Sequence, residues 1–276
     1  VLVTGAGGFI GSHLCAQLIK LGAKVTALIH YNSRSSYGNL DFLKDEEIES
    51  LNIIKGNIED PYFIDYVSEN IDIIFHLAAL IGIPYSYVSP LSYVKTNIEG
   101  TINLLETSKQ RNIKMIHTST SECYGTAIYT PIDESHPLQG QSPYSASKIS
   151  ADKIVESYHN SFGANIITIR PFNVFGPGQS ARAIIPTIIS QLIRSNNIEV
   201  GSTSPIRDFT YVEDTVSGFI KAAQHENISG DLINIGNGKG ISIKDLIYKC
   251  AEILKIENIN IIVNKERNRP EKSEVF

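Results

Sequence analysis

Short apolar runs alternate with helical patterns over the first 171 residues. The runs are continuous, as expected for strands buried on both faces of a parallel sheet. Predicted strands are Val1–Val3, Lys24–Ile29, Asn52–Lys55, Ile71–Leu77, Lys114–Ser119 and Asn165–Arg170, and predicted helices include Ser12–Leu21, Tyr93–Gln110 and Ser145–Phe162. This alternation predicts an α/β fold, a doubly wound parallel sheet of the Rossmann type.

The pattern changes after Pro171, where residues 172–182 are rich in glycine, proline and polar side chains. Further on, helices are predicted at Ala183–Ile193 and Ser242–Leu254, and extended segments at Ile206–Tyr211 and Leu232–Ile235. We expect residues 1–171 to form a dinucleotide-binding domain to which 209–237 return. Residues 172–208 and 238–276 are expected to form a smaller substrate-binding lobe. The chain begins inside a strand and its only methionine is Met115, so we expect it to be truncated at both ends.

Composition narrows the class of protein. The net charge of −5 and pI near 5.8 give no basic character, which argues against a nucleic-acid partner. Apolar stretches are short and interrupted, which argues against a membrane span. The three cysteines lack metal-ligand spacing and, without a signal peptide, indicate a reducing cytoplasm and no metal site.

Three glycines follow the first strand and precede the first helix, at Gly5, Gly8 and Gly11. Glycine permits a tight turn and lets backbone N–H groups approach a pyrophosphate at a helix N-terminus. A glycine-rich turn without a ligand is the alternative, but the strand and helix on either side favour a dinucleotide site.

The preference between NAD and NADP stays open. An acidic residue usually follows the second strand and binds the NAD ribose, but here the strand ends at His30 and no acid follows up to Arg34. Arg34 either meets a 2′-phosphate of NADP or is a solvated loop residue. His76 is expected to be a packed residue rather than a catalyst.

A Tyr-x-x-x-Lys motif, Tyr144 and Lys148, places two side chains on one helix face. The Lys148 ammonium is expected to lower the pKa of Tyr144, so that Tyr144 accepts a hydroxyl proton while hydride leaves for a nicotinamide. Thr120 ends the preceding strand and can hydrogen-bond the same oxygen. The motif's place between two predicted strands disfavours an incidental surface pair.

Taken together, these motifs resemble the extended short-chain dehydrogenase/reductase family, over nearly the whole chain. Further matching pieces are His76–Ala79, Asn97 and Arg170–Pro177. The resemblance implies NAD or NADP as cofactor and a homodimer built on a helix pair. It implies cofactor contacts from Gly5, Gly8, Phe9, Ile10, Gly11, His30, Arg34, Asn57, Ile58, Leu77, Ala78, Ala79, Tyr144, Lys148 and Pro171.

Glu122 separates the activities known in this family. Sugar-nucleotide 4,6-dehydratases carry a glutamate two residues after the catalytic Ser/Thr, whereas 4-epimerases usually have a small or neutral residue there. Once C4 is a ketone the C5 proton is acidic, and a carboxylate can remove it. This chain has Ser121 where many dehydratases have aspartate, so the group that protonates the leaving hydroxyl stays open between Glu122 and a water held by Ser121. Thr-Ser-Glu also occurs in GDP-mannose 4,6-dehydratases and UDP-glucuronate decarboxylases.

Longer motifs are similar to the N-acetylglucosamine-nucleotide 4,6-dehydratases of legionaminic acid biosynthesis. They are His30–Ser33, Thr118–Gly125, Pro131–Glu134, Pro137–Lys148, Gln179–Ala183 and Arg207–Phe209. This resemblance implies UDP- or GDP-N-acetylglucosamine as substrate.

Four residues beyond Pro171 are expected to contact the substrate. Asn173 by resemblance binds the diphosphate, and the guanidinium groups of Arg182, Arg207 and Arg269 are candidate phosphate ligands. The alternative for each arginine is a surface salt bridge. The remaining alternatives for the whole chain are a decarboxylase or a 4-epimerase on the same fold, and a non-catalytic nucleotide-binding regulator.

Overall fold

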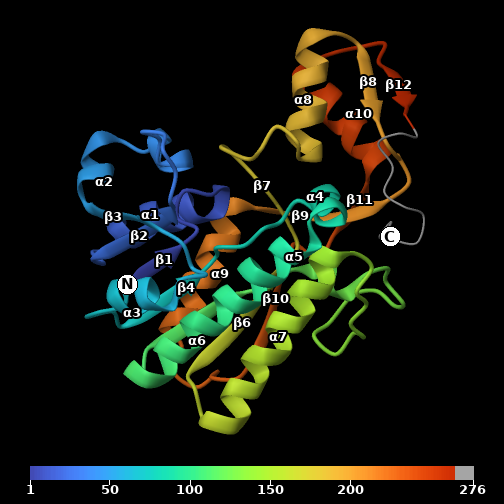
Figure 1. Ribbon diagram of the computed structural model, residues 1–276. Helices are drawn as coiled ribbons and strands as arrows, with labels where there is room; N and C mark the ends of the chain where they lie inside the picture. The colour runs from blue at the N-terminus through green and yellow to red at the C-terminus, as the bar shows by residue number, and fades with distance from the viewer. Residues whose placement is uncertain (265–276) are drawn as a thin grey trace.

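A seven-stranded parallel sheet forms the larger part of the computed structural model, which describes residues 1–264 (Figure 1). The strand order is β10-β6-β5-β4-β1-β2-β3 and every pairing is parallel. The strands are β1 (Leu2–Thr4), β2 (Val25–His30), β3 (Leu51–Gly56), β4 (Ile73–His76), β5 (Lys114–Thr118), β6 (Ile166–Pro171) and β10 (Leu232–Ile235). The order confirms the predicted doubly wound sheet. It reverses between β1 and β4, and such a switch point is where these sheets bind ligands.

Helices cover both faces of this sheet. On one face α1 (Phe9–Lys20) and α9 (Val212–Gln224) enclose an apolar core that includes Leu14 and Phe219. On the other face α3 (Pro61–Val67), α6 (Gly100–Arg111) and α7 (Pro143–Phe162) enclose a second core that includes Leu104 and Val155. Burial on both faces explains why the strands are continuous apolar runs rather than alternating ones.

The helix predicted at Tyr93–Gln110 is not a single α-helix. The structure places α4 (Ile83–Val88) and α5 (Pro90–Tyr93) before a π-helical segment, η2 (Val94–Glu99), which then continues as α6. A π turn carries an extra residue, and it often occurs at functional sites. Here it contains Asn97, whose side chain is buried.

The remaining elements of the larger part are short. They are the 3-10 segments η1 (Gly38–Phe42) and η3 (Ser121–Tyr124) and the helix α2 (Asp45–Glu49).

A smaller lobe lies beyond the carboxyl ends of the sheet strands (Figure 1). It contains the sheet β11-β9-β7 and the parallel pair β12-β8, with α8 and α10 packed in a separate apolar core. Its elements are β7 (Asn173–Phe175), α8 (Ile184–Arg194), β8 (Asn197–Val200), β9 (Ile206–Tyr211), β11 (Gly240–Ser242), α10 (Ile243–Leu254) and β12 (Asn260–Val263). The division into two domains near residue 171 remains a prediction.

Within residues 1–264, none of the helices combines the length and apolar character that crossing a membrane requires.

Candidate active site

The glycine turn after β1 has the shape that a dinucleotide phosphate group requires. Gly5 has φ +70°, and a Cβ at Gly11 would lie 2.3 Å from the Gly5 carbonyl oxygen. Gly8 is the N-cap of α1 and provides no side-chain cap, so the first N–H groups of the helix have no side-chain acceptor there. Phe9 and Ile10 supply two of these N–H groups. The turn therefore fits a pyrophosphate held at a helix N-terminus.

The loop after β2 folds back onto this turn. Asn39 N–H donates to the Gly7 carbonyl at 2.8 Å, and the Asn39 side chain donates to the Gly178 carbonyl at 2.7 Å. His30 at the end of β2 and Arg34 in the loop after it are both exposed. The Lys55 ammonium donates a hydrogen bond to the Arg34 carbonyl at 3.1 Å. The structure thus places Arg34 in the exposed loop after β2, with the Lys55 ammonium bonded to its backbone carbonyl.

His76 is a packed residue, as predicted. It lies between Thr4 Oγ1 at 2.8 Å and Thr101 Oγ1 at 3.0 Å. Thr101 donates its own proton to the Asn97 carbonyl at 2.7 Å, so His76 Nε2 is the donor to Thr101 and Nδ1 accepts from Thr4. Burial lowers the pKa of His76 well below its usual value, with smaller contributions from His117 and Lys148. The ring is therefore neutral.

The segment after β4 is fixed by hydrogen bonds rather than by side-chain packing alone. Ala78 N–H donates to Thr4 Oγ1 at 3.1 Å. Asn97 accepts from Leu80 N–H at 2.8 Å and donates to the Leu80 carbonyl and to Ser147 Oγ, both at 3.0 Å. The stretch with Leu77, Ala78 and Ala79 is thereby tied both to the glycine turn and to helix α7.

The other expected cofactor contacts lie at the edges of this region. Asn57 accepts from Glu59 N–H at 3.2 Å, Ile58 is buried beneath Gly100, and Pro171 ends β6 beside Ile235 of β10. These positions stay predictions as cofactor contacts.

Thr120, Tyr144 and Lys148 come together at the carboxyl end of β5. Thr120 hydrogen-bonds the Tyr144 side chain and also accepts from Glu122 N–H at 3.2 Å, as the cap of η3. Lys148 lies one turn after Tyr144 on α7, and its ammonium donates to the Thr118 carbonyl at 2.6 Å. Tyr93 packs edge-on against Tyr144 with ring centroids 6.2 Å apart.

The expectation that Lys148 lowers the pKa of Tyr144 is wrong for the free protein. Burial raises the pKa of Tyr144, and the hydrogen bond from Thr120 offsets this only in part. Burial also lowers the pKa of Lys148, which a nearby Asp152 counteracts. The sequence could not foresee this because the shift depends on how completely Tyr144 is covered, not on the spacing of the motif.

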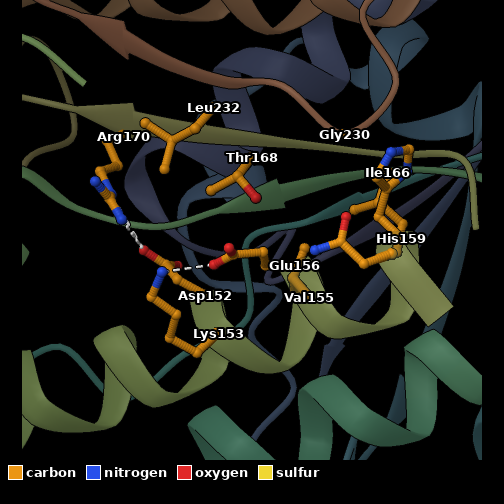
Figure 2. Close-up of a pocket in the computed structure, with 11 residues that line it drawn as sticks. Asp152, Lys153, Val155, Glu156, His159, Ile166, Thr168, Arg170, Gly230 and Leu232 are labelled. Atoms are coloured by element: carbon orange, nitrogen blue, oxygen red, sulfur yellow. Dashed lines mark hydrogen bonds and ion pairs between the residues drawn. The ribbon is translucent and has the colours of Figure 1, made fainter. Parts of the chain in front are cut away.

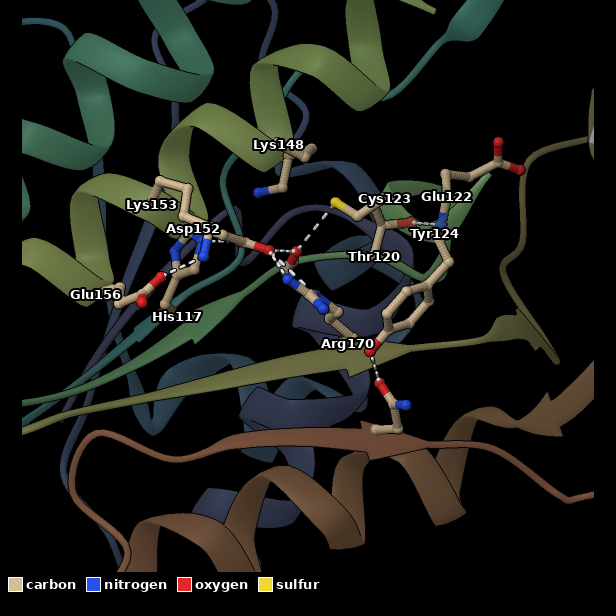
Figure 3. A network of polar contacts seen from close by, with 12 residues as sticks. His117, Thr120, Glu122, Cys123, Tyr124, Lys148, Asp152, Lys153, Glu156 and Arg170 are labelled. Carbon is tan, nitrogen blue, oxygen red and sulfur yellow. Dashed lines mark hydrogen bonds and ion pairs between the residues drawn. The ribbon is translucent and has the colours of Figure 1, made fainter. Parts of the chain in front are cut away.

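Glu122 and Ser121 lie in η3, beside this group. The Glu122 carboxylate is near enough to Tyr144 for its charge to raise the pKa of Tyr144, although burial is the larger cause. In Figure 3 the Glu122 side chain extends away from the buried contacts around Asp152.

A buried polar network behind Lys148 is the main feature that the sequence analysis missed. Asp152 accepts hydrogen bonds from Ser119 at 2.7 Å, from His117 at 3.2 Å and from Arg170 at 2.7 and 3.1 Å (Figure 3). The motif did contain a hint, since Asp152 is one turn after Lys148 and therefore lies on the same face of α7.

The residues expected to bind substrate are spread over the lobe. Asn173 lies in β7 two residues after Pro171, and Arg207 lies in β9, where its guanidinium donates to the Ile206 carbonyl at 2.9 Å. Arg182 is exposed, and its charge acts on Tyr93, whose pKa burial raises. Arg269 is outside the described residues. Among residues 1–264 there is no group of three His, Cys, Asp or Glu side chains that could hold a metal ion.

Comparisons with known proteins place the chain in a family. The profile of the GDP-mannose 4,6-dehydratase family matches residues 2–275. A dTDP-D-glucose 4,6-dehydratase of Dictyostelium discoideum is 34% identical over 270 residues, which cover 92% of this chain and 62% of that protein. The chain therefore spans less than two thirds of that relative's length.

Solved structures give the same fold. The structure of a DesIV double mutant, a dTDP-glucose 4,6-dehydratase from Streptomyces venezuelae with NAD bound, has a TM-score of 0.85 at 25% identity, covering 97% of this chain and 85% of that one. A UDP-N-acetylglucosamine 4-epimerase from Methanobrevibacter ruminantium has a TM-score of 0.86 at 32% identity, covering 97% and 86%.

The fold, the glycine turn and the Thr/Tyr/Lys group define an extended short-chain dehydrogenase/reductase, which confirms the resemblance seen in the motifs. Within that class, the chain belongs to the GDP-mannose 4,6-dehydratase family.

Proposed function

We propose that this protein is an NAD(P)-dependent nucleotide-sugar 4,6-dehydratase. The single observation that carries the proposal is Glu122 held in η3, two residues after Thr120 and beside Tyr144. Oxidation and reduction at C4 need only the Thr/Tyr/Lys group, so a carboxylate at this place serves a step at a neighbouring carbon. NAD(P), which the glycine turn at Gly5, Gly8 and Gly11 would hold, would supply the hydride chemistry, as acceptor at C4 and donor at C6.

The residues of the chain move the protons. Tyr144 accepts the proton of the 4-hydroxyl, while Thr120 hydrogen-bonds the same oxygen and Lys148 holds a positive charge one turn away. Glu122 then removes the C5 proton, which the C4 ketone has made acidic. The C6 hydroxyl leaves as water after protonation by Glu122 or by a water held at Ser121. Hydride addition at C6, together with a proton from solvent at C5, would give a 4-keto-6-deoxy sugar.

Burial shapes the pH dependence of the first proton transfer. Because burial raises the pKa of Tyr144, this side chain is a neutral phenol in the free protein and must ionise when substrate binds. Lys148 must keep its proton at the same time, although burial lowers its pKa. We expect the rate to rise with pH until Lys148 loses its proton.

The substrate that the motifs favour is UDP- or GDP-N-acetylglucosamine. Asn173, Arg182 and Arg207, together with Arg269, are the residues that we expect to contact the diphosphate, because guanidinium groups pair with phosphate oxygens. The functional unit is expected to be a homodimer.

A Glu122→Gln variant tests the proposal. It should bind cofactor and oxidise C4 as the natural protein does, but fail to release water, because the amide cannot accept the C5 proton. A matched control is Glu134→Gln, another glutamate of the same region, whose carboxylate accepts from Asn234 N–H at 2.8 Å. Normal dehydration by Glu122→Gln would contradict the assignment.

A second candidate function is 4-epimerisation of a UDP-sugar. It is favoured by the likeness to the UDP-N-acetylglucosamine 4-epimerase, which is as similar in fold as the dehydratase. An epimerase has no step that requires Glu122, so Glu122→Gln would leave its turnover unchanged.

A further inference from the structure

The aspartate behind Lys148 has a place that the reaction itself does not explain. Asp152 is 5% exposed, and its carboxylate accepts four hydrogen bonds from three neighbours: His117 on β5, Ser119 just after β5, and Arg170 on β6. Burial alone would raise its pKa, but the contacts with His117, Arg170 and Ser119 outweigh burial and lower it. The carboxylate is therefore ionised inside the protein.

The Asp152 carboxylate compensates the positive charge of buried cations around it. Arg170 and Lys148 are both buried cations, 2% and 3% exposed. His117 is buried and its pKa is lowered, so it is neutral and donates from Nε2, which leaves Nδ1 without a hydrogen-bond partner within residues 1–264. One carboxylate thus faces two cations. Buried charges are costly unless they are paired.

Lys148 depends on this carboxylate. Titratable groups from four elements act on Lys148 or are acted on by it: Asp152 from α7, Cys123 from η3, His76 from β4 and His117 from β5. Cys123 is protonated, because burial raises the pKa of its thiol to about 12. Both histidines are neutral. Within the described part of the chain, Asp152 is therefore the ionised carboxylate that acts on the Lys148 ammonium.

A pocket borders the Asp152–Arg170 pair, and Lys148 is not among the residues that line it. It has a volume of about 340 Å³ between α7, β6 and β10, and Asp152, Thr168 and Arg170 contribute to its wall (Figure 2). Lys153 and Glu156, which are exposed, pair with each other at its rim. A small molecule can approach the pair through this pocket without passing the cofactor or the sugar.

We propose that Asp152 is a positioning residue for the reaction: the buried carboxylate binds Arg170, Ser119 and His117 and keeps Lys148 charged and in place one turn from Tyr144. The role in turnover rests on the proposed function, whereas the role in cofactor binding does not. Asp152 itself touches neither Tyr144 nor the sugar in this account.

The first test needs no sugar. NADH affinity, measured by fluorescence as a function of pH, should fall when Lys148 loses its proton. In Asp152→Asn this fall should occur at lower pH than in the natural protein, since the carboxylate no longer supports the Lys148 ammonium. Glu156→Gln, which removes a carboxylate one turn further along α7 at the pocket rim, should leave the profile unchanged. An Asp152→Asn profile equal to that of the natural protein would overturn the proposal.

The second test uses turnover of the nucleotide sugar. Asp152→Asn should lower kcat by roughly 10²-fold, the scale of a misplaced catalytic group, with KM nearly unchanged. Its pH–rate profile should move to lower pH, because Asp152 supports the protonated forms of both Lys148 and Tyr144. A lower rate with an unmoved profile would indicate a merely structural residue. If the natural protein shows no turnover, the proposed function fails while the NADH test still decides on Asp152.

Chemical rescue separates loss of charge from loss of fold. Asp152→Ala opens space beside Arg170. Formate entering through the pocket should raise the turnover rate of this variant at least tenfold, whereas chloride should not. A folded variant that formate does not rescue would count against the proposal. Should the Asp152 variants fail to fold, Ser119→Ala removes one donor and leaves the charge. It should lower kcat with KM unchanged, and an unaltered kcat would refute the positioning role.

Discussion

Asn97 joins the segment after β4 to helix α7, and its removal has a predictable cost. The side chain is 1% exposed and takes part in three hydrogen bonds, two with Leu80 and one with Ser147. A hydrogen bond contributes about 1 kcal/mol to stability, and a buried group left unpaired costs about 1–3 kcal/mol. Asn97→Ala should therefore lower the free energy of unfolding by about 3 kcal/mol or slightly more.

The measurements are urea unfolding and thermal unfolding, both followed by circular dichroism without cofactor, because a bound ligand would add its own stabilisation. For a chain of this size each kcal/mol corresponds to about 2–4 °C in Tm, so a drop of about 6–12 °C is expected. Asn103→Ala on the adjoining helix is the control, since it loses a single hydrogen bond to the Ile58 carbonyl and should cost about 1 kcal/mol. Equal losses in the two variants would refute the account of Asn97.

Three further predictions concern pH, the glycine turn and the catalytic tyrosine. Burial lowers the pKa of His76 and of His117 below 6.5, so both stay neutral in the folded protein while the unfolded chain takes up protons. Above pH 6.5 the free energy of unfolding should have its full value. As the pH falls below 6.5, it should decrease by about 1.4 kcal/mol per pH unit for each histidine. Equal free energies of unfolding from urea titrations at about pH 7.5 and pH 5.5 would contradict this. Gly11→Ala puts a Cβ 2.3 Å from the Gly5 carbonyl oxygen and should weaken NAD binding by about 10²-fold, measured by calorimetry; unchanged affinity would exclude this turn as the phosphate site. Tyr144→Phe should bind NAD normally and lower kcat by about 10²–10⁴-fold, and a variant that turns over at the natural rate would remove Tyr144 from the mechanism.

Much of the large sheet could be predicted from the sequence. Its strands are buried on both faces, so continuous apolar runs identify them whatever their neighbours are. The predicted ranges Ile206–Tyr211 and Leu232–Ile235 match the observed strands β9 and β10. The short strands β7 and β11 were not foreseen, because three residues carry too little periodicity.

The site was predictable where the spacing of residues within one short stretch of sequence decides the geometry. The glycine turn and the Tyr144–Lys148 pair depend on such spacing, and the structure brings Thr120 close to Tyr144 and Lys148. The Asp152 network depends on contacts between β5, β6 and α7, and no single stretch of sequence reveals these. For the same reason the pKa of Tyr144 was misjudged, since its burial arises partly from Tyr93, which is 51 residues away.

The most direct test of the dehydratase assignment is proton NMR of the reaction in D₂O with UDP- and GDP-N-acetylglucosamine, using the full-length protein. The account predicts a new C6 methyl signal with deuterium at C5 and no net consumption of cofactor. A C4 epimer that keeps its C5 proton would contradict it and would establish an epimerase to which Glu122 contributes nothing.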